Sequence, residues 1–192
     1  MARRVGILGG TFDPVHIGHL ILAVCAREQL PCDELVLMPN VRSPLKAAGP
    51  VASFADRLAM LRLATDQTHG ISVSDLEGER DGPSYTVDTL SAFHARHPDD
   101  ELYLIVGNDA MKDFAAWHES ERVQALARIA VVSRLGEPPL PDPRVATIID
   151  MPRIDVSASR VRERVSRGLT IDFLTPAPVA AYIQRHGLYR SP

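Results

Sequence analysis

The sequence is poor in cysteine and has no long apolar run. Its 192 residues include two cysteines, Cys25 and Cys32, too few for a disulfide framework. No apolar stretch approaches the roughly 18 residues of a membrane-spanning helix. Residues 1–4 lead into a short strand pattern and not into the apolar core of a signal peptide. We therefore expect a cytoplasmic protein that makes no contact with a membrane.

The sequence also lacks a strong excess of charge of either sign. Its formal net charge is −3, so no overall basic field favours a nucleic acid polymer or an anionic membrane as partner. An anionic ligand must then be held by a local cluster of donors. Hydrophobic residues make up 45% of the chain, enough for a full core, and the length predicts one domain over residues 1–192.

Short apolar segments alternate with helical patterns along the whole chain. This alternation predicts an α/β fold, a doubly wound and mostly parallel sheet, with a small helical C-terminal part over about residues 157–192. Ligands of such folds bind outside the carboxyl ends of the strands. The expected strands are 5–8, 34–38, 71–76, 101–106, 128–133 and 145–149. The expected helices are 18–30, 54–68, 86–97, 108–114, 120–127, 157–167 and 177–186.

The segment GGTFDPVHIGHL, residues 9–20, joins the first strand to the first helix. Its glycines permit positive φ and a close approach of a ligand to the backbone, and Asp13-Pro14 is a turn signal. His19 falls in the first helical turn, where free N–H groups attract anions. The segment therefore favours a phosphate site that includes His16 and His19.

Other readings of this segment are weaker. A strand–turn–helix connection with solvent-facing histidines and no ligand does not explain why two histidines and three glycines occur together. A zinc site lacks a nearby cysteine or third histidine. A dinucleotide fingerprint and a P-loop require G-x-G-x-x-G or G-K-[ST], and neither is present here.

At this point the chain resembles a known family. GTFDPVHIGH resembles the T/HxGH signature of the nucleotidyltransferase superfamily, which joins a nucleoside triphosphate to a phosphate-bearing acceptor and releases pyrophosphate. The longer GGTFDPxHxGH is similar to the bacterial nicotinate-nucleotide adenylyltransferases, and the similarity runs from Val5 to the last predicted helix. VSASRVR resembles a second signature, ISSTxxR, except that Ala158 lacks a hydroxyl and Ser159 replaces threonine. The resemblance implies a Rossmann-like fold.

Two further segments resemble the acceptor site of this family. GPSYTVDTL, residues 82–90, is similar to SYT-x-DTL, which supplies backbone contacts to a pyridine carboxylate; Thr86 is also the expected cap of the helix. A G-x-D…W pattern places Asp109 at a ribose and Trp117 against the pyridine ring.

The loop MPNVRSPLK, residues 38–46, resembles the P-P-H-K loop of the family. Lys46 can meet a phosphate as a point charge, but Leu45 stands in place of the histidine. Either Arg42 takes over that contact or the loop binds ATP less tightly. We interpret Glu77 to Asp81 as a solvated charge run and His94 and His97 as surface residues.

The resemblance implies transfer of the adenylyl group of ATP to nicotinic acid mononucleotide, which gives nicotinic acid adenine dinucleotide and pyrophosphate in NAD biosynthesis. The acceptor phosphate is already an anion, so catalysis needs positioning and charge neutralisation. Mg²⁺ is expected through the ATP phosphates, with no protein metal site, and a homo-oligomer is left open. The residues assigned to catalysis are His16, His19, Lys46 and Arg162. The residues assigned to ATP are Gly9, Gly10, Thr11, Phe12, Gly18, Gly107, Asp109, Ser157 and Ser159. The residues assigned to the mononucleotide are Asn40, Ser84, Tyr85, Thr86 and Trp117.

Four other functions compete with this one. A phosphopantetheine adenylyltransferase shares the two signatures but usually carries threonine where His16 stands, and it lacks the acceptor segments; a cytidylyltransferase fits less well still. An inactive nucleotide-binding regulator is favoured only by Leu45 and Ala158. A dehydrogenase requires the glycine fingerprint that is missing.

Overall fold

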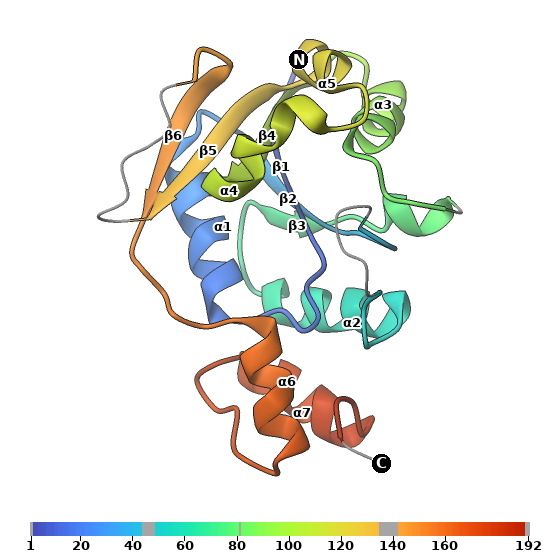
Figure 1. The fold of residues 1–192 in the computed structure, drawn as a ribbon, viewed down its shortest axis with the longest axis vertical. Helices are drawn as coiled ribbons and strands as arrows, with labels where there is room; N and C mark the ends of the chain where they lie inside the picture. The colour runs from blue at the N-terminus through green and yellow to red at the C-terminus, as the bar shows by residue number, and fades with distance from the viewer. Residues whose placement is uncertain (1, 44–48, 81, 135–141, 191–192) are drawn as a thin grey trace.

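The fold is a six-stranded sheet with helices on both faces (Figure 1). The computed structural model describes residues 2–43, 49–80, 82–134 and 142–190. The strands are β1 Arg4–Gly10, β2 Glu34–Pro39, β3 Ile71–Val73, β4 Glu101–Gly107, β5 Arg128–Arg134 and β6 Val145–Met151. The helices are α1 Ile17–Gln29, α2 Phe54–Thr65, α3 Thr86–Arg96, α4 Asn108–Lys112, α5 Ser120–Leu126, α6 Ala158–Ser166 and α7 Ala177–Arg185, with two 3₁₀ turns, η1 Leu76–Glu79 and η2 Phe114–Ala116.

All the strand pairs are parallel, in the order β3-β2-β1-β4-β5-β6. The order reverses between β1 and β4, and in open α/β sheets such a switch point opens a crevice at the carboxyl ends of the strands. The predicted Rossmann-like α/β class is confirmed. The structure therefore directs attention to the segments that follow β1 and β4.

The strands are apolar along their length because both faces of the sheet are covered. Along β2, Leu35 and Leu37 pack on one face, with α1 and α2, while Val36 and Met38 pack on the other, with α3 and α5. The same alternation divides the other central strands between two hydrophobic cores. No described helix is both long enough and apolar enough to cross a membrane.

The ends of several helices follow from local hydrogen bonding. Ser53 and Ser157 cap α2 and α6, because their hydroxyls accept from Asp56 N and Arg160 N at 3.1 and 3.2 Å. The residue before α3 is Tyr85, so Thr86 is the first helical residue and not the expected cap.

Two predicted elements run three residues past the observed ones. The helix expected to reach residue 68 ends at Thr65. The strand expected over 71–76 ends at Val73, and the chain then enters the 3₁₀ turn η1.

The helical C-terminal part, α6 and α7, lies below the carboxyl edge of the sheet in Figure 1. Hydrogen bonds join it to the rest of the chain at several points, among them the following three and one from Arg162 to Asp13. Ile17 N donates to Leu174 O at 2.9 Å, Tyr182 Oη to Asp56 Oδ1 at 3.0 Å, and Tyr189 Oη to Asp13 Oδ1 at 2.7 Å. The C-terminal part thereby forms one wall of the crevice.

Candidate active site

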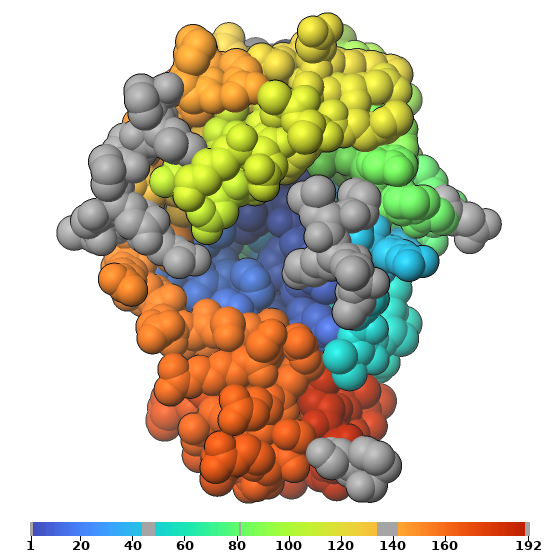
Figure 2. All heavy atoms as spheres, viewed as in Figure 1, coloured from blue at the N-terminus to red at the C-terminus, as the bar shows by residue number. Residues whose placement is uncertain are grey.

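Two adjoining cavities open at the carboxyl edge of the sheet. The first, of about 680 Å³, extends from the ends of β1 and β4 to the start of α3. The second, of about 690 Å³, lies between the start of α1 and the start of α6. Phe12, His19 and Ser43 line both. Figure 2 shows a hollow in this face, with blue N-terminal atoms as its floor and the orange C-terminal part below it.

The two histidines meet where α1 begins. His16 immediately precedes the helix, and the imidazoles of His16 and His19 stack with their centroids 3.7 Å apart. The backbone N–H of His16 donates to Nδ1 of His19 at 3.3 Å. Since Nδ1 accepts, the ring proton of neutral His19 lies on Nε2, which can donate to a ligand.

His16 is the buried member of the pair, with 7% of its surface exposed. Burial lowers the pKa of His16 to about 4, so its ring is neutral at pH 7. Its Nδ1 has no hydrogen-bond partner among the described residues. His16 therefore offers a neutral, polar ring at the edge of the second cavity.

The glycines of this segment make room for aromatic rings. None of Gly9, Gly10 and Gly18 has a positive φ, so the positive φ that glycine permits is not adopted here. A Cβ on Gly10 would come within 2.8 Å of the Phe12 ring, and one on Gly18 within 3.1 Å of the His16 ring. Only at Gly9 is the space next to the Cα open, which leaves Gly9 as the position where a ligand can approach closely. Phe12 itself takes a positive φ of 47°.

The predicted phosphate donors of α6 face this segment. Ser157, Ser159 and Arg162 line the second cavity together with Thr11 and His16. The guanidinium of Arg162 donates to the backbone oxygen of Asp13 at 2.6 Å and to Ser159 Oγ at 3.2 Å. The structure thus brings both sequence signatures to one cavity.

Asp13 links this cavity to the C-terminus. Its carboxylate accepts hydrogen bonds from Val51 N at 2.7 Å, Ala52 N at 3.2 Å and the Tyr189 hydroxyl at 2.7 Å. Burial, together with the bond to Asp13, raises the pKa of Tyr189 far above its usual range, so the phenol keeps the proton that it donates. The carboxylate of Asp13 is therefore hydrogen-bonded to other groups of the protein.

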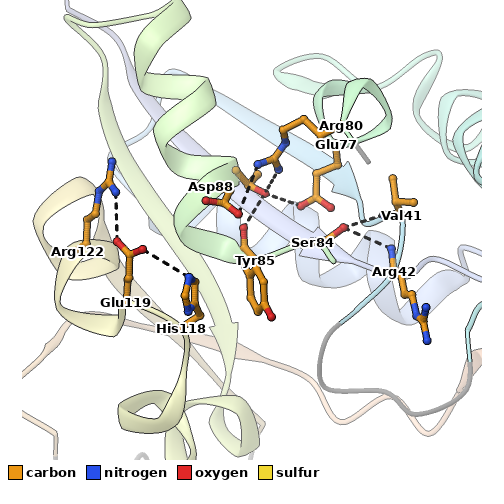
Figure 3. Close-up of polar contacts among 11 residues, drawn as sticks. Val41, Arg42, Glu77, Arg80, Ser84, Tyr85, Asp88, His118, Glu119 and Arg122 are labelled. Atoms are coloured by element: carbon orange, nitrogen blue, oxygen red, sulfur yellow. Dashed lines mark hydrogen bonds and ion pairs between the residues drawn. The ribbon is translucent and has the colours of Figure 1, made fainter. Parts of the chain in front are cut away.

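The first cavity contains all the residues assigned to the mononucleotide: Asn40, Ser84, Tyr85, Thr86 and Trp117. The hydroxyl of Ser84 accepts from Val41 N at 3.0 Å and Arg42 N at 3.4 Å, which ties the start of α3 to the end of β2 (Figure 3). Nε1 of Trp117 is buried and has no hydrogen-bond partner among the described residues.

Four residues assigned to ATP lie outside the second cavity. Gly9, Gly10 and Gly107 line the first cavity and not the second. Asp109 lines neither; its exposed carboxylate accepts from Lys112 Nζ at 2.8 Å. Lys46 and Leu45 lie outside the described residues. Arg42 is exposed at the end of β2.

Comparisons with known proteins agree with this geometry. Residues 7–164 match the model of a family described as cytidylyltransferase-like. A probable nicotinate-nucleotide adenylyltransferase of Rhodopirellula baltica is 42% identical over 97% of this chain and 93% of its own length. One of Thermus thermophilus is 39% identical over 97% of this chain and its full length. The chain belongs to the nicotinate-nucleotide adenylyltransferase family.

The chain also superposes on solved structures of nicotinate-nucleotide adenylyltransferases. The nicotinic acid mononucleotide adenylyltransferase of Plasmodium falciparum, complexed with NaAD, superposes with a TM-score of 0.79 over 97% of both chains at 20% identity. A putative nicotinate-nucleotide adenylyltransferase of Vibrio parahaemolyticus has a TM-score of 0.74 at 17% identity. These likenesses establish the fold of the chain.

Sequence reasoning missed two residues of the first cavity. Glu77 is not part of a solvated run: it is 7% exposed, lines the cavity and accepts from Thr89 Oγ1 at 2.8 Å. His118 faces Tyr85, with ring centroids 4.5 Å apart (Figure 3). The position of His118 directly after Trp117 was the available signal, whereas nothing in the charge run around Glu77 marks that residue as buried.

Proposed function

We propose that this chain transfers the adenylyl group of ATP to nicotinic acid mononucleotide, giving nicotinic acid adenine dinucleotide and releasing pyrophosphate. The observation that carries the proposal is the position of His19, which lines both cavities at the point where they meet. A transfer between two phosphates needs a donor at such a junction, because the α-phosphate of ATP gains charge there as the acceptor attacks.

The second cavity suits the triphosphate. It combines the start of α1, whose free N–H groups favour an anion, with the hydroxyls of Ser157 and Ser159 and the guanidinium of Arg162. Arg162 is held by Asp13 O and Ser159, so its orientation is set before a ligand arrives. Lys46 is assigned to the same triphosphate by the family resemblance.

The first cavity suits the mononucleotide. The ring of Trp117 offers a flat apolar surface to a pyridine. The start of α3, with Thr86 as its first residue, offers backbone N–H groups of the first helical turn to a carboxylate. This pairing of a flat surface with anion donors favours the acid over the amide mononucleotide.

The residues of the second cavity fit Mg²⁺ only when it is bound through the phosphates of ATP. The donors of the second cavity are imidazole, hydroxyl and guanidinium groups, and the carboxylate of Asp13 is bonded to Val51, Ala52 and Tyr189. Mg²⁺ prefers oxygen ligands and retains waters, so phosphate and water oxygens would hold it. Its chemistry there is neutralisation of phosphate charge.

The test is pyrophosphate release with ATP and Mg²⁺, comparing nicotinic acid mononucleotide, nicotinamide mononucleotide and phosphopantetheine as acceptors. We expect turnover that is much faster with the acid mononucleotide than with either alternative. Preferred turnover of phosphopantetheine would replace the proposed acceptor. Binding of ATP without pyrophosphate release from any acceptor would instead identify a regulator, and the variants Leu45→His and Ala158→Ser would then test whether those two positions account for the loss.

A further inference from the structure

The side chain of Arg57 in α2 lies fully inside the protein, with 1% of its surface exposed. It belongs to neither signature of the family, and it lines neither cavity. Burial lowers its pKa, and the nearby Asp13 opposes that effect. An arginine buried to this degree requires partners for most of its donors.

These partners are backbone oxygens from three separate segments. Nη1 donates to Thr11 O at 2.8 Å and to Asn40 O at 2.7 Å. Nη2 donates to Val41 O and Nε to Ala52 O, both at 3.3 Å. One guanidinium therefore donates to four carbonyl groups at once.

At Thr11 and Asn40 the chain segments after β1 and β2 diverge toward the two cavities. The register of β1 and β2 ends with Gly10 opposite Pro39, so Thr11 and Asn40 are the next residues of the two strands. Beyond Thr11 the chain runs to His16 and His19 and the second cavity. Asn40 itself lines the first cavity. Nη1 of Arg57 thus extends the alignment of the two strands by one residue, between the two cavities.

We propose that Arg57 is a positioning residue that fixes the segment after β1 relative to the segment after β2, and so aligns the acceptor phosphate with the α-phosphate of ATP. The inference rests on the proposed function. Each substrate binds mainly to its own cavity, whereas the reaction requires both at a defined separation. Loss of Arg57 should therefore lower kcat more than it weakens the binding of either substrate alone.

The experiment compares Arg57→Lys with Arg62→Gln, a control on the same helix at an exposed arginine that pairs with Asp75. Lysine keeps the charge, but a single nitrogen cannot reach four carbonyl groups spread over three segments. We expect kcat of Arg57→Lys to fall about 100-fold, the cost of a misplacement of about 1 Å. The dissociation constants of ATP alone and of nicotinic acid mononucleotide alone should each stay within about threefold of wild type. Trp117 is the only tryptophan of the sequence, so its fluorescence measures the binding of nicotinic acid mononucleotide.

A second variant separates positioning from folding. Arg57→Ala is assayed with and without added ethylguanidinium, with ethylammonium as the control cation. Recovery of kcat with ethylguanidinium alone would support the inference. A folded Arg57→Lys with kcat within about threefold of wild type would overturn it, and so would a loss of kcat matched by an equal loss of substrate binding. If wild type and Arg62→Gln also fail to release pyrophosphate, the proposed function fails and not the role of Arg57.

Discussion

At the scale of single residues, His19 is the group on which the proposed chemistry depends. Its Nδ1 accepts from His16 N, so the ring proton of neutral His19 lies on Nε2, the nitrogen that donates to the α-phosphate in the proposed reaction. We expect His19→Ala to lower kcat by about 100- to 1,000-fold, about 3–4 kcal/mol, the typical cost of losing a donor to a developing negative charge. Pyrophosphate release measures the loss, and thermal unfolding should show little change.

His94→Ala is the matched control, since His94 lies on α3 outside both cavities. Its kcat should equal that of wild type. A His19→Ala protein that keeps kcat within a few-fold of wild type would remove His19 from the chemistry.

The neighbouring His16 makes a prediction about pH. Its pKa is about 4 in the folded protein and 6.5 in the unfolded chain. Between these values the unfolded chain binds more protons, so the free energy of unfolding rises with pH over this window and falls on acidification. This contribution is complete above pH 6.5 and amounts to about 3 kcal/mol over the window.

Urea unfolding of wild type and His16→Gln between pH 4 and 7.5 tests this prediction. Other groups titrate equally in the two proteins, so the difference between the two curves isolates His16. We expect wild type to lose more stability than the variant between pH 6.5 and 4. Parallel curves would mean that the ring of His16 is not desolvated as the structure indicates.

At the scale of elements, the start of α3 is held by a buried polar cluster. The hydroxyl of Thr89 contacts Glu77 Oε1 at 2.8 Å, Tyr85 O at 3.2 Å and Arg80 Nη2 at 3.0 Å (Figure 3 shows Glu77, Tyr85 and Arg80). Thr89→Val keeps the shape and leaves Glu77 without this partner. We expect the free energy of unfolding to fall by about 1–3 kcal/mol. The KM for the mononucleotide should rise several-fold while the KM for ATP is unchanged.

Ser91→Ala gives the control on the same helix, because the buried Oγ of Ser91 has no hydrogen-bond partner among the described residues. It should change neither KM. Equal increases in both KM values for Thr89→Val would mean that the cluster supports the whole site and not the acceptor cavity alone.

The strands and loops of the fold could be predicted from the sequence, whereas the burial of some charged residues could not. The strands and the loops after β1 and β4 follow from apolar runs and turn residues, which are local signals. Arg57 and Glu77 do not, because each lies in a segment whose charges suggest exposure, and only the packing of distant segments buries them. The sequence also does not predict why position 10 is glycine. The turn after β1 places the Phe12 ring where a Cβ on Gly10 would lie.

At the scale of the whole molecule, the hydroxyl of Tyr189 is one of the groups that join the C-terminal part to the site, beside the guanidinium of Arg162. Tyr189 and Asp13 are 176 residues apart in the chain, and the bond between them is buried. Tyr189→Phe removes the donor and leaves the carboxylate with Val51 N and Ala52 N. We expect the free energy of unfolding, measured in urea by circular dichroism, to fall by about 1–3 kcal/mol.

The same substitution should act on one substrate more than on the other. α6 and its N-cap Ser157 line the second cavity, with Ser159 and Arg162 from the helix itself, and they contribute nothing to the first. If Tyr189 holds α6 against Asp13, its loss raises the KM for ATP and spares the KM for the mononucleotide. Tyr182→Phe, which removes a half-buried hydroxyl bonded to Asp56 on α2, should leave both unchanged. A Tyr189→Phe protein that is less stable but has unaltered KM for ATP would show that the C-terminal part stabilises the fold without shaping the triphosphate site.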